Sequence, residues 1–323
     1  MIKRIWNTLK YYLLTLLLPT VLFALLMLVE PETVKLSQLG LLFQQAIIPA
    51  VLAWGVYFDL TAGNWDFSLG AIALVAGITS YSLAEMFQLS MPLFIILCLL
   101  ISTLLGGINA VLFYFTRIPT LIISIGMLFV LESLSSIIFG GGGVLVKSEW
   151  VVFGIFPNNV FAGVIFFIIA LFLYKFHKFG YQVRAVGLNS SVAQNNGISV
   201  YGIKIKALVV AGFFAGGFAF LTLCSNAVYS PESGMTTTSV VFDAMMCYYA
   251  GLVLSEFTDC IFATFIGSVF LQTVKLAILV LGFNTTYQRV FISLMVLLLI
   301  AVNSRGEKFG SFLKKRKKEA ADG

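Results

Sequence analysis

The sequence predicts an all-α, polytopic integral membrane protein. Its 323 residues are 60% hydrophobic and only 11% charged, and their mean hydropathy is +1.01. The apolar residues gather in stretches close to the length that crosses a bilayer, and the basic residues gather between and beyond these stretches. A water-soluble fold of this length could not hide so much apolar surface, so lipid is the expected solvent for most of the chain.

Hydropathy divides the chain into about ten transmembrane segments, one or two of them too short to cross unaided, because a crossing helix needs about 20 apolar residues. They are 11–29, 39–58, 67–87, 93–115, 120–139, 160–176, 207–227, 240–254, 260–281 and 290–302. The first follows a basic cluster, as a signal peptide does, but its length and the lack of a small-residue cleavage pattern favour an uncleaved span. We therefore expect a membrane domain over 1–306 and a basic tail over 307–323.

Ten crossings place both termini on one side of the membrane, and the distribution of charge makes that side the cytoplasm. Basic residues concentrate at the N-terminus, in 175–206 and in the tail at 314–318. The same count places a loop at about 178–204 inside and a loop at 140–159 outside. We interpret the basic flanks as contacts with anionic lipid headgroups rather than with nucleic acid.

Two of the apolar stretches are interrupted by polar segments that each carry two acids. Residues 59–66 separate the second stretch from the third, and residues 256–259 separate the eighth from the ninth. Broken helices at corresponding positions predict an inverted repeat that relates segments two to five to segments seven to ten. Non-helical backbone at membrane depth is tolerated only where protein or a water-filled cavity satisfies it.

Asp66, Ser68 and Gly70 stand at the predicted start of the third segment. An acid at a helix start meets the positive end of the helix dipole, and Ser68 is expected to cap free amides. Gly70 begins a run of small residues that permits close helix packing. For Asp66 we favour a capping role over a direct contact with substrate, since acids at helix N-termini are commonly caps.

Three further polar side chains fall within apolar segments. Asn109 is expected to bond to a neighbouring helix. Glu132 is an intramembrane acid, and such a group needs a partner or a cavity. It either lines a path or pairs with another chain, or else it is an interfacial residue if its helix ends early. Asp243 has the same readings.

The stretch 180–198 is a polar, basic-flanked loop between long apolar segments, and it predicts a short helix on the cytoplasmic face. Asn189 or Ser190 would cap that helix, and Gly197, before Ile198, would close it in the left-handed conformation. Ala193 would allow close approach by a partner. Residue chemistry alone favours an ordinary membrane-surface helix, whereas a partner-driven transporter would use the same helix as a lever.

Catalytic and metal-binding functions have little support. None of the four cysteines is spaced as CxxC or stands near the single histidine, so they are expected to be small buried hydrophobic residues. The chain contains neither HExxH nor the phosphate-binding GxxxxGK[ST] motif. No serine, cysteine or threonine has an evident general base. We expect a non-enzyme that binds no cofactor or metal itself.

Four motifs together resemble the permease subunits of bacterial ABC importers for ribose, xylose, galactose and related ligands. Residues 66–70, DFSLG, resemble the family's Asp-Leu-Ser-Val-Gly signature, and 118–126 resemble its Ile-Pro-x-Phe-Ile-x-Thr-Leu-Gly segment. Gly140 and Gly141 match the pair that closes the same helix. The stretch from Arg184 through Gly187, Asn189, Ala193 and Gly197 to Ile198 resembles the coupling loop. The similarity covers roughly residues 40–300.

This resemblance implies a permease in the bacterial cell membrane that works by alternating access. A separate cytoplasmic ATPase, which holds ATP and Mg²⁺, would grip the 187–198 loop. An extracytoplasmic binding protein would deliver the ligand, and two permease chains would enclose the path. The ligand itself, whether a sugar, a nucleoside or an autoinducer, stays open.

The chain departs from the family pattern at three places. The coupling loop has Ser190-Ser191 and Gln194-Asn195 where acidic or proline and basic residues are usual, and 249–256 replace a glycine-rich stretch. Glu132-Ser133 stands where the family has Arg-Gly. This charge reversal suggests a heterodimer in which a different paralogue supplies the complementary charge.

One other class of transporter fits the sequence. A self-powered secondary transporter would use Asp59, Asp66, Glu132 or Asp243 to couple the solute to protons or sodium. Uptake driven by an ion gradient without an ATPase would identify it.

Overall fold

The computed structural model confirms an all-α, polytopic architecture. It describes residues 16–17, 19–31, 33–36, 38–255, 258–284 and 287–299. The basic tail at 307–323, and Glu256 within the second predicted break, lie outside these residues. The chain forms two compact units, one made of Ser37–Ala244 and the other of Met1–Leu36 with Met245–Gly323.

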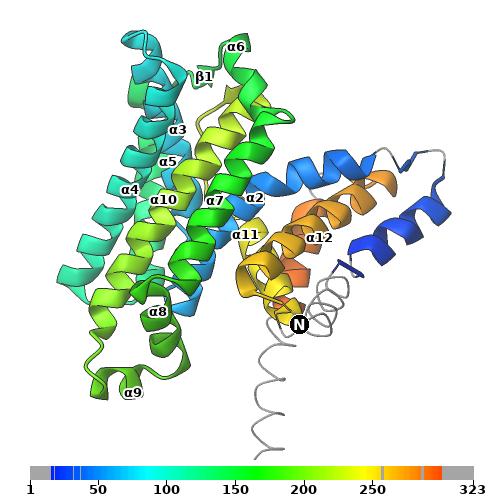
Figure 1. Ribbon diagram of the computed structural model, residues 1–323. Coiled ribbons are helices and arrows are strands. Elements are labelled where there is room, and N and C mark those ends of the chain that lie inside the picture. The colour runs from blue at the N-terminus through cyan, green and yellow to red at the C-terminus, as the bar shows by residue number, and fades with distance from the viewer. Residues whose placement is uncertain are drawn as a thin grey trace, which may run out of the picture. The chain divides into compact units, whose positions relative to one another are not determined.

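The Ser37–Ala244 unit holds most of the helices (Figure 1). Its long helices are α2 (Gln38–Thr61), α3 (Leu69–Met86), α4 (Met91–Thr116), α5 (Thr120–Ser135), α7 (Asn158–Lys175) and α10 (Val200–Asn226). Shorter elements are η1 (Ile138–Gly141), α6 (Ser148–Val151), η2 (Val152–Gly154), α8 (Lys178–Leu188) and α9 (Ser190–Asn195). Helix α11 (Thr238–Leu254) begins in this unit and ends in the other.

Every predicted apolar segment corresponds to a helix among the described residues. Six of these helices are long and apolar enough to cross a membrane: α2, α3, α4, α7, α10 and α12 (Cys260–Val280). The shorter apolar helices are Pro19–Val29, α5, α11 and Tyr287–Leu299. Helix α5, with 16 residues, spans only about 24 Å at 1.5 Å per residue, which is less than the hydrocarbon core of a bilayer.

The fifth predicted segment, 120–139, was too long. Helix α5 ends at Ser135, and the chain then turns through Phe139 and Gly140, which both have positive φ. The expected loop at 140–159 is also more ordered than hydropathy suggests. It contains α6, η2 and strand β1 (Val144–Leu145), which pairs antiparallel with β2 (Val228–Tyr229). Hydropathy missed this pairing because each strand has only two residues.

Glycines set the spacing between the central helices. Helix α10 lies against α4 and α2 (Figure 1). Gly106 of α4 faces Gly212 of α10, and a side chain added at Gly55 of α2 would strike Ala211 and Phe214 of α10. Bulky side chains fill the remaining core, among them Trp54, Phe58, Tyr81, Phe94 and Phe214. Close packing of this kind is what holds transmembrane helices together, because lipid offers no hydrophobic driving force between them.

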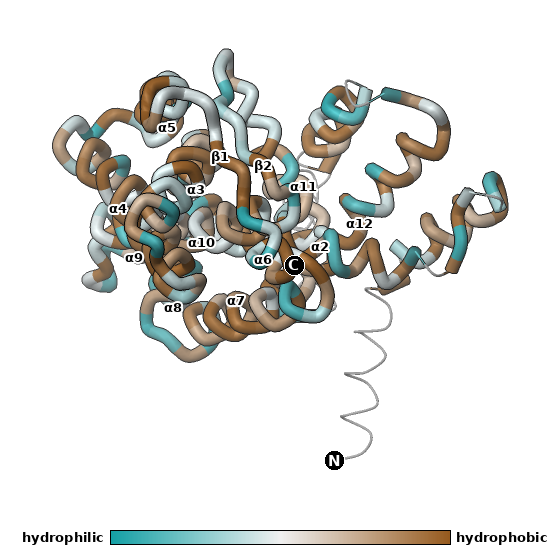
Figure 2. The backbone as a smooth tube through the Cα atoms, turned by 90° about the horizontal axis from the view of Figure 1, so that it is seen from above, coloured by the Kyte–Doolittle hydropathy of each residue, from teal (hydrophilic) through white to brown (hydrophobic). Residues whose placement is uncertain are grey.

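The outward faces of the helices are apolar as well. The hydrophobic colour runs along α4 and α7 in Figure 2. On α4, Leu100 and Leu104 are exposed, and on α7 Phe161 and Ile165 are exposed. In a water-soluble protein such faces would be polar, so their composition is that of helices in contact with lipid.

The second unit is also helical in its described part. It contains Pro19–Val29, the end of α11, α12 and Tyr287–Leu299. Gly267 of α12 approaches the backbone of Cys247, and Gly251 of α11 approaches that of Thr264. The inverted repeat stays a prediction, since the segments of its second half, seven to ten, are divided between the two units.

Candidate functional site

The first predicted break separates α2 from α3 and is built from the last turn of α2 and the loop 62–68. The loop turns at Gly63, whose φ of +77° is a left-handed backbone conformation that glycine adopts more readily than other residues. The amide of Asn64 donates to the carbonyl oxygen of Asp59 at 2.9 Å. The Asn64 side-chain nitrogen donates to Asp59 Oδ1 at 3.1 Å and to the carbonyl oxygen of Lys204 on α10 at 2.9 Å. The break is therefore fastened to the start of α10.

Asp66 lies in the same break and has hydrogen-bond partners within the chain. Its Oδ1 accepts hydrogen bonds from the Ser68 amide at 2.8 Å and the Ser68 hydroxyl at 2.5 Å. Its Oδ2 accepts from the side-chain amide of Asn109 on α4 at 2.9 Å. Burial raises the pKa of the Asp66 carboxyl, and the hydrogen bonds from Ser68 and Asn109 offset part of that rise.

This geometry corrects one expectation and confirms another. Ser68 occupies the N-cap position of α3, but its side chain makes no bond to a helix amide, because its hydroxyl donates to Asp66. The prediction that Ser68 caps free amides is therefore wrong. Asn109 does bond outside its own helix, to Asp66 in the loop and to the hydroxyl of Ser68, the N-cap residue of the neighbouring α3, at 3.1 Å. The three side chains form one buried polar cluster.

Helix α5 also contacts the break, through two residues of the 118–126 motif for which the sequence predicted no partner. The Trp65 amide donates to Thr120 Oγ1 at 3.0 Å, and the Ser124 hydroxyl donates to the Trp65 carbonyl oxygen at 3.2 Å. Thr120 and Ser124 both lie within the first two turns of α5. Their spacing of four residues, which puts both on one helix face, was the available signal.

Glu132, near the other end of α5, holds the start of α11. Its Oε2 accepts from the Met235 amide at 2.8 Å, and its Oε1 accepts from the Thr237 amide at 2.9 Å and the Thr237 hydroxyl at 2.6 Å. Amides just before a helix have no partner within it, so a buried carboxylate is well suited to them. The predicted partner of Glu132 is thus supplied by its own chain.

Gly70 lets α3 pack closely against the residues that precede α11. A side chain added at Gly70 would collide with the carbonyl group of Thr237, so only glycine permits this approach. Helices α3 and α5 therefore both contact the segment that leads into α11. The remaining acid of this group, Asp243, lies on α11 and is half-buried.

Helices α8 and α9 form a hairpin, which we call the coupling hairpin (178–198). Asn189 is the N-cap of α9, and its Oδ1 accepts from the Val192 amide at 3.0 Å. Gly197 ends the helix with φ +78°. The Gly197 amide donates to the Gln194 carbonyl, and the Ile198 amide donates to the Ala193 carbonyl, which is the pattern of a Schellman cap. The predicted short helix and both of its caps are confirmed.

The exposed side chains of the coupling hairpin differ from the expectation. Ala193 is only 3% exposed and packs within the chain, so it offers no surface to a partner. Leu188 is 89% exposed and Val192 is 54% exposed. These two lie four residues apart at the tip of the hairpin, on either side of Asn189. Sequence reasoning missed them because isolated aliphatic residues in a polar loop carry no motif.

Gly187 ties the coupling hairpin to the first break. A side chain added at Gly187 would meet the carbonyl oxygen of Thr61, the last residue of α2. Asp59 lies in that same final turn. The hairpin, the end of α2, the break and the start of α10 are thus connected by direct contact and hydrogen bonds.

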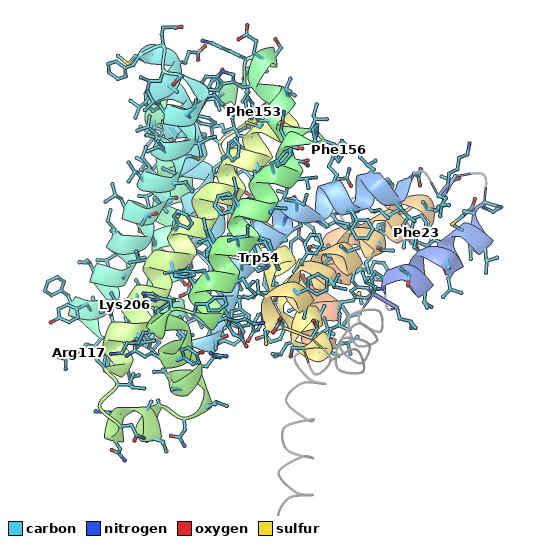
Figure 3. The ribbon with its side chains drawn as sticks, in the orientation of Figure 1. Phe23, Trp54, Arg117, Phe153, Phe156 and Lys206 are labelled. Carbon is cyan, nitrogen blue, oxygen red and sulfur yellow. The ribbon has the colours of Figure 1, made fainter. Side chains whose placement is uncertain are left out.

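The coupling hairpin lies at the end of its unit opposite α6 and β1 (Figure 1). Figure 3 shows Arg117 and Lys206 toward the hairpin end, and Phe153 and Phe156 toward the other. Among the described residues, no group of three or more His, Cys, Asp or Glu side chains is placed to hold a metal ion.

Residues 39–300 match the family model described as "Branched-chain amino acid transport system / permease component". The chain is 23% identical to the ribose import permease protein RbsC of Haemophilus influenzae, over 89% of this chain and 92% of the relative. It is 28% identical to the L-arabinose ABC transporter permease protein AraH of Azospirillum brasilense, over 83% and 80%. It is 26% identical to the autoinducer 2 import system permease protein LsrC of Photorhabdus laumondii, over 92% and 93%. No solved structure gives a significant match.

Proposed function

This chain belongs to the branched-chain amino acid transport system / permease component family, and we propose that it is the membrane permease of an ABC importer for a sugar or a related small polar ligand. Relatives named for ribose, arabinose and autoinducer 2 support this ligand class, since each is similar along most of both chains. The chain would line the path and hydrolyse no ATP itself.

The observation that carries the proposal is the contact between Gly187 and Thr61. A permease driven by a separate ATPase needs a rigid connection between its docking surface and its membrane helices. Here the docking surface would be Leu188 and Val192, and the connection would run through Gly187 to the end of α2. A push on the hairpin would move α2 and the break beside it, which is the movement that alternating access requires.

The charge distribution supports a cytoplasmic place for the coupling hairpin. Arg117, Lys175, Lys178, Arg184 and Lys206 all stand within or beside the segments at that end. Cytoplasmic flanks of membrane proteins carry an excess of Lys and Arg. We therefore propose a multi-pass protein of the bacterial cell membrane with both termini in the cytoplasm and α6 and β1 on the external side.

The proposed partners follow from this orientation. A cytoplasmic ATPase holding ATP and Mg²⁺ would dock on the hairpin, and an extracytoplasmic binding protein would deliver the ligand to the α6 end. A second permease chain would complete the path. Glu132 has three donors within its own chain, so it gives no reason to require a different paralogue as that second chain.

Ion-coupled transport is the less supported alternative. Two of the four acids that it would use, Asp66 and Glu132, are engaged in hydrogen bonds that join parts of the fold. A group that must bind and release an ion cannot readily be the support of a helix end at the same time. Solute uptake driven by an ion gradient, in membranes without any ATPase, would support ion-coupled transport instead.

Affinity purification of the tagged chain from native membranes in mild detergent, followed by mass spectrometry, tests the proposal. An associated P-loop ATPase is expected, and a second, different permease would identify a heterodimer. Uptake of labelled ribose and arabinose should then depend on the chain and on ATP. Recovery of the chain alone, under conditions that preserve another ABC importer of the same cell, would contradict the proposal.

A further inference from the structure

The joint between α2 and α10 contains two buried oxygen atoms that have no hydrogen-bond donor among the described residues. They are Asp59 Oδ2 and Asn64 Oδ1, on side chains that are 2% and 0% exposed. The same two side chains already share one hydrogen bond, from Asn64 Nδ2 to Asp59 Oδ1. Buried oxygens without donors are rare in folded proteins because each has lost its hydrogen bonds to water without gaining a replacement.

The side-chain amide of Asn64 has only one sensible orientation. Its nitrogen donates both to Asp59 Oδ1 and to the carbonyl oxygen of Lys204. If the amide were turned over, its oxygen would face these two acceptors and both bonds would be lost. The unpartnered Asn64 Oδ1 is therefore a property of the site and not of how the amide is drawn.

Three physical facts disfavour a negative charge on Asp59. The side chain is buried, and an unpaired carboxylate is costly in such surroundings. It lies in the last turn of α2, at the negative end of the helix dipole. Asn64 is neutral, and among the described residues no cation is paired with Asp59.

The charged groups on the elements around Asp59 have other partners. Lys204 of α10 donates through Nζ to the Gly63 carbonyl oxygen at 3.2 Å. Arg184 of α8 donates to the carbonyl oxygens of Gly180 and Tyr174, and its guanidinium lies 4.4 Å from the centre of the Tyr174 ring. The end of α7 contributes Tyr174 and Lys175, and the loop contributes the buried acid Asp66.

We propose that Asp59 binds a proton on Oδ2 and donates it to Asn64 Oδ1, so that the two side chains form a closed acid–amide pair. One proton then satisfies both unpartnered oxygens, and it removes the buried charge. The pair has two parallel hydrogen bonds, one in each direction. It clamps the end of α2 to the loop and, through Asn64 and Lys204, to α10.

The asparagine substitution at Asp59 is the decisive variant, because an amide has the same shape and the same donor as a protonated acid. The full chain is purified in lipid nanodiscs, and its thermal unfolding midpoint is measured. Asp59→Asn should keep the midpoint within about 2 °C of the wild type, whereas Asp59→Ala should lower it by ~4 °C or more. If Asp59→Asn lowers the unfolding midpoint as much as Asp59→Ala does, the proposal is overturned. That result is the one expected if Asp59 is a charged carboxylate that holds a cation.

Infrared spectroscopy keeps the proposal falsifiable if either variant folds poorly. The wild type at neutral pH should show the carbonyl stretching band of a protonated carboxyl, and this band should lose intensity in Asp59→Asn but not in Glu85→Gln, which replaces an exposed acid. Folding that takes up a proton makes the wild type less stable as pH rises above about 4, the ordinary pKa of an aspartate in an unfolded chain, so its midpoint should fall relative to that of Asp59→Asn as pH is raised from there. Identical spectra or parallel pH profiles would overturn the proposal.

The test uses no ligand and no ATPase. Its outcome is therefore independent of whether the chain imports a sugar.

Discussion

Glu132 Oε1 accepts hydrogen bonds from both the amide and the hydroxyl of Thr237, although the two residues are 105 positions apart in the chain. With the bond from the Met235 amide, this carboxylate anchors the start of α11 to α5. Helix α11 begins in one compact unit and ends in the other. The anchor therefore sets the position of α11 at its origin in the Ser37–Ala244 unit.

Replacing Glu132 should destabilise the fold. In Glu132→Ala the amides of Met235 and Thr237 lose a buried acceptor, and each bond to a charged group is worth about 1.5–3 kcal/mol. The thermal unfolding midpoint of the purified chain should fall accordingly. Glu85→Ala, at an exposed position, is the control and should change little. A Glu132→Ala variant as stable as the wild type would show that the anchor is unimportant.

Gly187→Ala should uncouple the hairpin from α2. The added methyl group would meet the carbonyl oxygen of Thr61, so α8 must move away from the helix end that it contacts. ATP-dependent uptake should fall several-fold at equal membrane level. Gly107→Ala is the matched control, since that glycine is also helical and has open space around it. Equal uptake in the two variants would separate transport from the contact between α8 and α2.

Leu188→Ser should weaken binding of the ATPase without unfolding the permease. An 89% exposed leucine contributes little to its own fold, but it would bury its apolar surface against a partner. Recovery of the ATPase with the tagged chain should drop, while the yield of the chain is unchanged. Phe176→Ser removes another exposed apolar side chain, at the C-cap of α7, and should leave recovery intact. If both variants behave alike, the tip is not the docking point.

Asn109→Ala should destabilise the first break. Its side chain donates to Asp66 Oδ2 and to the Ser68 hydroxyl, and without it a buried carboxylate oxygen has no donor. We expect a loss of about 1–3 kcal/mol, seen as a lower unfolding midpoint. The exposed neighbour Ile108 provides the control Ile108→Ala. An unchanged midpoint in Asn109→Ala would mean that other donors or water replace the amide.

Local features of the chain were predictable from the sequence because they depend on neighbouring residues. Hydropathy located the long apolar helices among the described residues, though not the short α6 and η2, since a lipid-facing helix must be apolar along its whole length. Asn189 and Gly197 predicted where α9 begins and ends, because capping involves residues only three to five positions apart. Asp66 and Gly70 do flank the start of α3, but the predicted capping of helix amides by Asp66 does not form, because Asp66 Oδ1 accepts from the Ser68 amide and hydroxyl.

The partners of the polar residues were not predictable. For Glu132 the sequence left three roles open, lining a path, pairing with another chain or lying at the interface, since its actual donors lie more than 100 positions away. Sequence reasoning also expected Ser68 to cap amides, and it expected Ala193 to meet a partner. Instead, the Ser68 hydroxyl donates to Asp66, and the side chain of Ala193 is buried within its own chain. A list of residue types contains no information about which competing acceptor or neighbour comes closer.

The sequence by itself determined the solvent, the long apolar helices and the caps of α9, because burial in lipid and capping act on residues close together in the chain. Only the tertiary structure decided which helices touch and which polar groups are satisfied. Gly187 against Thr61, Gly70 against Thr237 and Asn64 between Asp59 and Lys204 are contacts between distant segments. Such contacts depend on how whole helices pack, and that packing results from the combined shape of many side chains and not from any local pattern.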